Sequence, residues 1–343
     1  MVACTWPARR ALDALDALDE RRRRLYLVPE HANKLAYSLG GLIADHVHLS
    51  DASGFSSPST TTLRPWRPTR AATSSPAAQR LRPRFPLLGR DGDDRVDGLH
   101  LLRVFVSASY KRPREANWVL GVVLVGITAA LFFTGTVLKW DQESIEALGH
   151  NIEIGKLLGR FGFWFSPTFG GIPLLTRLYV VHIAVLPFLL TLVLAVHLLL
   201  VKRHGMAPSP FRKGPEPEPT RPFSSHLAEL GSLALVLIGV LTILAVFLPP
   251  AHGPAPVQGI EVTKPPWPML WIYPIEDWLG VSGILWATLA IFAALLIVPF
   301  VDRSSERSPR RRLPSIIVGV AVVITLIALI VYAGGQPVAS HLG

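Results

Sequence analysis

The sequence has almost no cysteine, since Cys4 is the single one among 343 residues. This excludes a disulfide framework, and also a zinc or iron–sulfur site built from thiolates of this chain. Acidic residues are fewer than basic ones, and the formal net charge is +10. The basic residues cluster in loops between apolar runs and in the N-terminal third, as the positive-inside rule of membrane proteins describes. We therefore expect membrane lipid, and no nucleic acid, among the partners.

Charged residues are absent from Leu178 to Val201, a run long enough to cross a bilayer core as a helix. His182 and His197 interrupt this run fifteen positions apart. In a helix they lie within about 60° on one face, with a rise of about 22 Å between them. Neutral imidazole is a common ligand of haem iron, so the spacing predicts two stacked cofactors. A pair of histidines that hydrogen-bond between helices is the alternative.

The fold class predicted from these runs is all-α, a polytopic bundle of transmembrane helices. Five spans are clear: Trp118–Leu138, Leu178–Val201, Leu230–Leu248, Leu279–Val301 and Ser315–Val331. The connector of residues 139–176 is long enough to contain surface helices of its own. The loops after Val201 and after Val301 are basic, which places them on the negative, cytoplasmic side of a bacterial cell membrane.

The N-terminal third differs from the rest. Residues 1–44 predict a surface helix followed by the entrance to a spanning helix. Residues 45–98 are rich in Ser, Thr, Pro and Arg, a composition that predicts irregular or disordered chain. The remaining chain divides into 99–205, a linker at 206–228, a second apolar unit at 229–335 and a tail at 336–343.

Four segments resemble cytochrome b of the cytochrome bc and bf complexes: SYKRPREANWVLGV, FTGTVLKWDQ, the two-histidine helix ending in KRHG, and PFVDRSSERSP. The resemblance covers about residues 25–43 and 99–335. It implies a haem-bearing half at 99–205, fused to a half similar to subunit IV that carries a quinol-oxidation site. The function it implies is that of the cytochrome b subunit of a quinol:cytochrome c oxidoreductase, a proton-translocating enzyme of a respiratory chain.

The same resemblance implies two haems b, quinol as the substrate, and a homodimer. It also implies a Rieske-type iron–sulfur protein and a cytochrome c or similar acceptor as partners. Carried over residue by residue, His100 and His197 would ligate the haem near the negative side, and His182 the haem near the positive side.

Further positions match the family's cofactor-binding residues. Arg103 stands where the family has a propionate-binding arginine, and Arg177 lies near the positive-side haem. Gly121 and Gly135 match haem-facing glycines, although glycines that let helices pack closely are the alternative. His204, with its basic neighbours, matches a site for reduced-side quinone or haem propionates, with a plain surface-charge role as the alternative.

The sequence departs from the family before His100. The partner of His182 would lie fourteen residues earlier, at Pro86, and no histidine lies between His48 and His100. Because the length is preserved while the composition breaks, we interpret residues 45–98 as an out-of-frame translation or a damaged gene copy. The alternative for this stretch is a genuine insertion that leaves a single-haem protein. For the function of the chain, the alternatives are a dihaem membrane anchor of another dehydrogenase and a non-functional product.

The quinol-oxidation motif also departs from the family, where it is Pro-Glu-Trp-Tyr. Here Lys264 is followed by Pro265, Pro266, Trp267 and Pro268, so Pro266 replaces the glutamate that is thought to take a quinol proton. Quinol oxidation releases protons, and an acceptor has to lie within hydrogen-bond reach. Glu276 and Asp277 are the nearby carboxylates, and we favour Glu276, with ordinary solvation of an interface as the alternative role.

Overall fold

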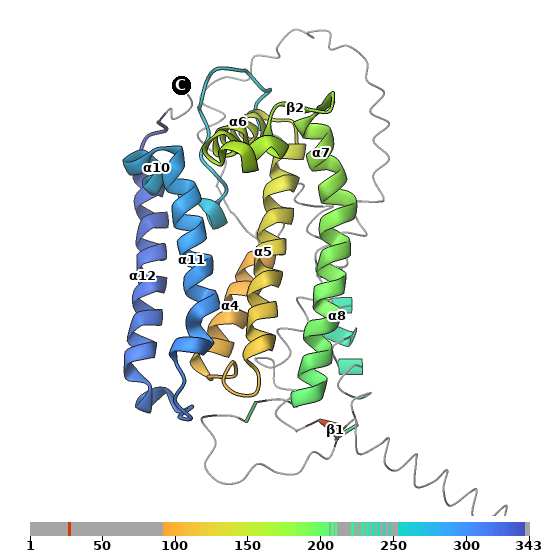
Figure 1. The fold of residues 1–343 in the computed structure, drawn as a ribbon, viewed down its shortest axis with the longest axis vertical. Helices are drawn as coiled ribbons and strands as arrows, with labels where there is room; N and C mark the ends of the chain where they lie inside the picture. Colours follow the sequence, from red (N-terminus) through yellow and green to blue (C-terminus); the bar gives the residue numbers. More distant parts are fainter. Residues whose placement is uncertain are drawn as a thin grey trace, which may run out of the picture.

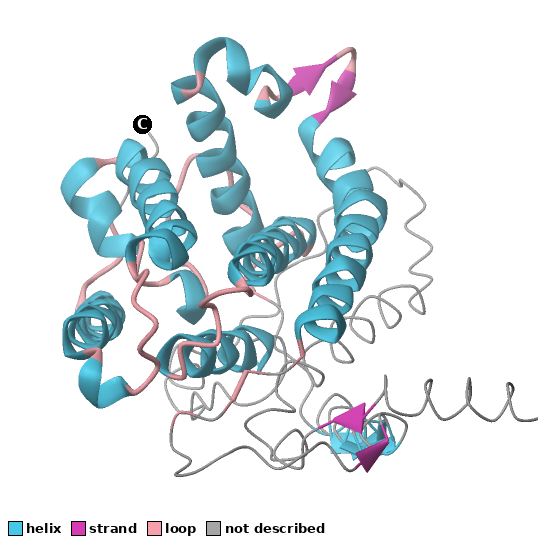
Figure 2. Ribbon diagram, turned by 60° about the horizontal axis from the view of Figure 1, so that its bottom comes forward, coloured by secondary structure: helices cyan, strands magenta, loops and turns pink. Residues whose placement is uncertain are grey.

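The computed structural model describes residues 92–205 and 253–339, residues 27–28, and individual positions between 207 and 247. The predictions for residues 1–44, for Pro86 and most of 45–98, and for most of Leu230–Leu248 lie outside the described residues. In the described part helices dominate, and the strands are two-residue pairs (Figure 2). These pairs are β1 (Leu27–Val28) with β4 (Arg221–Pro222), and β2 (Thr168–Phe169) with β3 (Ile172–Pro173). The all-α prediction is confirmed.

Among the described residues, four helices are long and apolar enough to cross a membrane. They are α5 (Glu115–Leu138), the continuous helix Leu174–His204, α11 (Val281–Val301) and α12 (Leu313–Gly335). The second consists of α7 (Leu174–Val180), η3 (Val181–Val185) and α8 (Leu186–His204). Each contains or closely overlaps a span predicted from the sequence.

Two predicted boundaries are wrong. Helix α4 spans Gly92–Val106, so helix begins inside the stretch predicted to be irregular up to residue 98. The sequence GDDRVD opens this helix. Leu279 does not begin a span, because it ends α10 (Tyr273–Leu279). Gly280 then adopts φ +67°, a left-handed conformation that suits glycine, and redirects the chain into α11.

The long connector folds into surface helices as predicted, namely α6 (Gln142–Leu157) and the 3₁₀ segment η2 (Gly159–Phe165). Asp141 and Ser144 form a reciprocal capping box at the start of α6, which satisfies backbone N–H groups that the first turn leaves open. Helices α6 and α10 and the β2 hairpin lie at one end of the molecule, and the α11–α12 turn lies at the other (Figure 1). The short 3₁₀ turn η4 (Trp267–Met269) precedes α10.

A hydrophobic cluster joins the two halves of the chain through α4, α5 and α11. Its buried members are Tyr110, Trp118 and Val122, and residues such as Phe292 of α11 pack against them. The indole nitrogen of Trp118 donates to the Leu295 carbonyl at 2.7 Å. The segments 99–205 and 229–335 therefore share one core.

A buried ionic network centred on Asp302 ties the α4–α5 turn to the α11–α12 turn. Its carboxylate accepts from Tyr110 Oη at 2.6 Å and from Lys111 Nζ at 2.7 Å, and pairs with Arg312 Nη2 at 2.8 Å. Burial alone would raise the pKa of this carboxyl, but the hydrogen bonds from Lys111, Tyr110 and Arg312 hold the pKa well below its usual range. The network therefore contributes stability above the unfolded carboxyl pKa of about 4 and loses it as pH falls.

We predict that Asp302→Asn destabilises the fold by about 3 kcal/mol near neutral pH, because two buried cations lose their counter-ion. The measurement is the thermal midpoint of the detergent-solubilised protein, and the deficit should shrink as pH falls below about 4. Glu306→Gln is the matched control, since Glu306 lies in the same turn and pairs at 3.2 Å with the exposed Arg311. Equal midpoints for Asp302→Asn and wild type would contradict the prediction.

Candidate functional site

Helices α5 and α8 lie side by side and place two glycines opposite two histidines (Figure 1). A Cβ built on Gly121 would lie 3.5 Å from Cε1 of His197, and one built on Gly135 would lie 3.2 Å from Cε1 of His182. Fourteen residues separate the glycines and fifteen the histidines, so both pairs are about four helical turns apart. The two helices therefore form two levels along the bundle.

At the level of Gly121, two half-buried imidazoles come from different helices. His100 of α4 lies within electrostatic range of Arg103 and of His197 on α8. His197 also interacts with the backbone of Asn117. The Nδ1 atoms of His100 and His197 are both buried without a hydrogen-bond partner. Buried polar atoms without partners are rare and require an explanation, which a shared ligand between the two rings would supply.

At the level of Gly135, the helix around His182 is widened. Residues Val181–Val185 form a π-helical turn, in which the N–H of Leu186 bonds the Val181 carbonyl. Pro187, which has no N–H to donate, follows this turn. Single π turns occur frequently at functional sites. The sequence analysis did not predict the turn, and Pro187 within an apolar run was the available signal.

Thr134 fixes the orientation of the His182 ring. Its Oγ1 lies 2.8 Å from His182 Nδ1 and donates to the Ala130 carbonyl at 2.7 Å. Because that hydroxyl proton is used by Ala130, Oγ1 accepts from an Nδ1–H, and Nε2 carries the lone pair. A carbonyl, carboxylate or hydroxyl that bonds the other ring nitrogen is the usual support for a metal-ligating histidine. Sequence reasoning did not identify Thr134.

The predicted arginine and His204 sites have specific surroundings. Arg177 is buried, and its guanidinium donates to the carbonyls of Trp164 and Ser166, with the Trp164 ring centroid at 5.4 Å. The carbonyl of His204 accepts from Arg114 at 3.0 Å, while its Nδ1 is buried without a hydrogen-bond partner. Arg177 therefore anchors the connector as well as lying near His182, and His204 ends α8 on the His197 side.

The Pro-Pro-Trp-Pro loop is anchored to the end of α12. Lys264 Nζ donates to the Ala333 carbonyl at 2.6 Å and also to the Gln336 carbonyl, and it lies 5.6 Å from the Tyr273 ring centroid. The Pro266 carbonyl accepts from the backbone of Met269 at 2.8 Å, where η4 begins. The structure thus gives Lys264 a role in positioning the loop. The predicted part of this loop in quinol chemistry stays a prediction.

Glu276 lies next to a histidine that the sequence analysis did not single out. His150 Nε2 of α6 is 2.7 Å from Glu276 Oε1 and 3.5 Å from Glu261 Oε1, and both carboxylates are about 5% exposed. Burial lowers the pKa of His150, but contact with Glu276, the Glu146 carbonyl and Glu261 outweighs burial and raises it. Asp277, the other carboxylate considered, is exposed.

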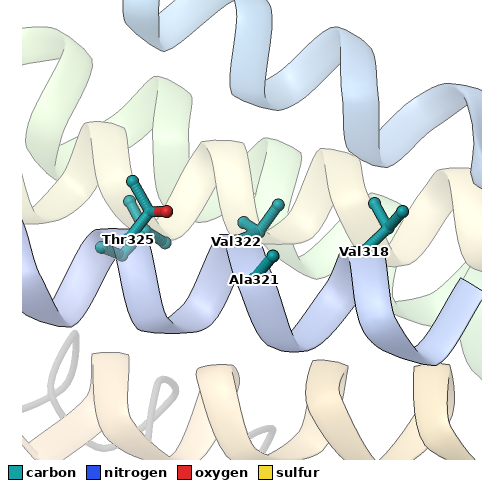
Figure 3. A pocket seen from close by; sticks show the side chains of 5 residues that line it. Val318, Ala321, Val322 and Thr325 are labelled. Carbon is teal, nitrogen blue, oxygen red and sulfur yellow. The ribbon is translucent and has the colours of Figure 1, made fainter.

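A separate apolar pocket runs along α12 (Figure 3). Its lining residues are Val318, Ala321, Val322, Thr325 and Leu326. None of these side chains titrates or ligates iron, so the pocket contributes nothing to the histidine levels.

Two family profiles match the chain. "Cytochrome b(N-terminal)/b6/petB" matches residues 96–256, and "Cytochrome b(C-terminal)/b6/petD" matches residues 255–342. The chain belongs to the cytochrome b/b6 family. The resemblance inferred from the motifs is confirmed, and the profile boundary falls within the loop that precedes the Pro-Pro-Trp-Pro segment.

Individual relatives agree with this membership. The chain is 33% identical over 115 residues to "Menaquinol:cytochrome c reductase cytochrome b subunit" of Geobacillus thermodenitrificans, which covers 32% of this chain and 51% of that protein. It is 32% identical over 231 residues to "Cytochrome bc complex cytochrome b subunit" of Chlorobaculum thiosulfatiphilum, covering 62% of this chain and 53% of that protein. The chain thus spans about half the length of these curated relatives.

The fold has a counterpart among solved structures. A chain of "Hyperthermophilic respiratory Complex III" superposes with a TM-score of 0.59 at 22% identity, covering 72% of this chain and 70% of that one. At this identity the match supports the fold alone.

The residues of the Gly121 level fit the haem b that the family implies. His100 and His197 supply two imidazoles with unused Nδ1 atoms, and Gly121 leaves the space beside the His197 ring without a side chain. At the Gly135 level, Gly135 leaves the space beside the His182 ring without a side chain, while the position expected for the second ligand, Pro86, lies outside the described residues and cannot coordinate iron.

We predict that Gly121→Leu lowers the haem-to-protein ratio of the purified protein, because the new side chain would occupy the space against the His197 ring. Haem content can be measured by the pyridine haemochrome assay. Gly334→Leu is the matched control, since a Cβ at Gly334 meets open space. Full haem content in Gly121→Leu would show that this glycine does not serve the cofactor.

Proposed function

We propose that the chain is the cytochrome b subunit of a quinol:cytochrome c oxidoreductase in a bacterial cytoplasmic membrane. The observation that carries this proposal is the pair of half-buried imidazoles on separate helices, His100 and His197, which lie within electrostatic range of each other, with His197 beside Gly121. The names of the relatives, which include a menaquinol:cytochrome c reductase subunit, support the same activity.

The proposed haem-binding residues lie at two levels of the bundle. Haem b, when bound, supplies one-electron redox chemistry. His100 and His197 would hold its iron near the negative side, and Arg103 and His204 would bind its propionates. His182, oriented by Thr134, would contribute a ligand near the positive side, beside Gly135 and five residues after Arg177.

Quinol is oxidised, in this proposal, near residues 264–268, where the loop is pinned to α12. Glu276 takes over the proton-accepting role of the motif glutamate that Pro266 replaces. The partners are a Rieske-type iron–sulfur protein, a cytochrome c or similar acceptor, and a second copy of the chain.

A single-haem or non-functional chain is the second candidate, favoured by Pro86 in place of the expected histidine. Without a second imidazole opposite His182, electron transfer across the membrane would stop on the positive side, at the His182 level. A dihaem anchor of another dehydrogenase is less well supported, because the second profile matches residues 255–342, which include the Pro-Pro-Trp-Pro loop.

A redox titration of reduced-minus-oxidised spectra of the membrane complex separates these candidates. We expect two b-type components, with one lost in both His100→Leu and His197→Leu and the other lost in His182→Leu. One component that depends on His100 and His197 supports the single-haem chain. If His100→Leu leaves the spectrum of the wild type unchanged, the assignment of the axial pair is wrong.

For the proton acceptor, we predict that Glu276→Gln slows quinol oxidation at least about tenfold, because the amide cannot take up a proton. The rate of cytochrome c reduction by duroquinol is the measurement. Asp277→Asn, at the adjacent exposed position, should leave the rate unchanged. An unaltered rate and pH profile in Glu276→Gln would end the assignment.

A further inference from the structure

Helix α6 turns two buried polar side chains toward the loop that precedes η4, which passes beside this helix (Figure 1). They are Gln142, which is 1% exposed, and Glu146, one helical turn later, which is 6% exposed. Gln142 Nε2 donates to Glu146 Oε1 at 2.8 Å, and we call these two side chains the α6 polar pair. Burying polar groups costs free energy unless they are hydrogen-bonded, so the partners of the pair define its role.

Gln142 holds the loop at Val257 and Ile260. Its Nε2 donates to the Ile260 carbonyl at 3.0 Å and to the Val257 carbonyl at 3.2 Å, while its Oε1 accepts from Val257 N at 2.7 Å. The backbone N–H of Gln142 also donates to the Pro254 carbonyl at 3.0 Å. These partners lie 115 and 118 positions along the chain from Gln142 in the case of Val257 and Ile260. One side chain therefore fixes two distant loop positions against α6.

Glu146 holds the positions that follow, Val262 and Thr263. Its Oε1 accepts from Val262 N at 2.8 Å, and its Oε2 accepts from Thr263 N at 3.1 Å and from the Thr263 hydroxyl. With Gln142 Nε2, four donors meet the four lone-pair sites of one carboxylate. Hydrogen bonds to a carboxylate are stronger than those to a neutral oxygen, so Glu146 makes the firmer contacts of the α6 polar pair.

Hydrophobic burial contributes little to holding this loop against α6. The side chains of Val257, Ile260 and Val262 are 52%, 45% and 52% exposed. Apolar side chains stabilise a contact in proportion to the area that they remove from water, and these remove little. The position of the loop therefore depends on its backbone groups, which the α6 polar pair binds.

The chain is fixed again immediately after Thr263. Lys264 Nζ is held by carbonyls at the end of α12. Pro265 and Pro266 follow, and a proline ring restricts both its own φ and the conformation of the residue before it. Pro266 adopts φ −56° and ψ 153°, an extended conformation, directly before the η4 turn. These stiff residues carry the position of the anchored loop over to the Pro-Pro-Trp-Pro segment.

We propose that Gln142 and Glu146 are positioning residues of the quinol-oxidation site, an inference that rests on the proposed function. By holding residues 257–263 against α6, they set where the Pro-Pro-Trp-Pro segment lies when quinol binds. Both side chains act through the loop backbone and not by contact with the quinol. When this hold is lost, the loop occupies its binding-competent position for only part of the time, and the apparent affinity for quinol falls by that fraction.

Three substitutions test the α6 polar pair. Glu146→Gln keeps the size of the side chain but replaces one acceptor oxygen with an NH₂ donor, which then faces other donors. Thr263→Val is milder, because it removes the hydroxyl donor and keeps the backbone bond to Oε2. Glu143→Gln is the matched control, since it removes the same charge from the same helix but pairs with Lys139 and not with the loop.

The first measurement is cytochrome c reduction by duroquinol in the assembled complex, over a range of duroquinol concentrations and expressed per haem b. For Glu146→Gln we expect KM to rise about tenfold while kcat stays within about twofold of wild type, because binding weakens and the redox groups are unchanged. For Thr263→Val we expect a rise in KM of about threefold, as for the loss of one hydrogen bond. Glu143→Gln should match wild type. A merely structural role would lower haem content or kcat and leave KM unchanged.

The second measurement is amide hydrogen exchange of the same complexes, followed by mass spectrometry. In Glu146→Gln we expect the amides of Val257, Val262 and Thr263 to exchange at least about tenfold faster than in wild type, because side chains of the α6 polar pair accept from them. Exchange within α6 and α12 should stay at the wild-type rate, which separates a loosened loop from a loosened fold.

The outcomes separate the two proposals. If duroquinol supports no cytochrome c reduction in the wild-type complex, the proposed function fails and the inference fails with it. If the wild type is active and Glu146→Gln keeps the wild-type KM, or raises KM without faster exchange of the three loop amides, the inference alone is overturned. If Glu146→Gln does not assemble, Thr263→Val decides, and a wild-type KM in that variant overturns the inference.

Discussion

The structure depends on the register of α5 against α8. Close approach of the two helices is possible because glycines occupy the α5 positions that face the histidine rings, at 3.5 Å for Gly121 and 3.2 Å for Gly135. A shift of one residue would turn each glycine away by about 100° and present a branched side chain to the imidazole. The common spacing of about four turns therefore places two histidines at two depths of the same bundle.

Charged side chains form contacts between distant segments at both ends of the molecule. At the α11–α12 turn, the Asp302 carboxylate pairs with two cations, Lys111 and Arg312, and its role is structural. At the α6 end, His150 Nε2 lies 2.7 Å from Glu276 Oε1 and 3.5 Å from Glu261 Oε1. The first set of contacts ties the α4–α5 turn to the α11–α12 turn, and the second ties α6 to α10.

The sequence predicted those features that local patterns determine. Apolar runs located the spans, the fifteen-residue spacing put His182 and His197 on one face, and the motifs identified the family. Contacts between distant segments were not predictable in this way, because His150 meets Glu276 only after α6 and α10 pack at the same end. The π turn at Val181–Val185 depends on how the helix accommodates Pro187, and the spacing of apolar residues does not predict it. The start of α4 at Gly92 was missed because composition averaged over residues 45–98 hid a short acidic helix start.

The central claim is that His100 and His197 clamp the same iron. Near-infrared magnetic circular dichroism of the oxidised protein reports axial ligands directly, because bis-imidazole haem has a distinct charge-transfer band. We predict a bis-imidazole band in the wild type. Both His100→Leu and His197→Leu should lose the contribution of this haem to that band. A bis-imidazole signal that persists undiminished in either variant would contradict it.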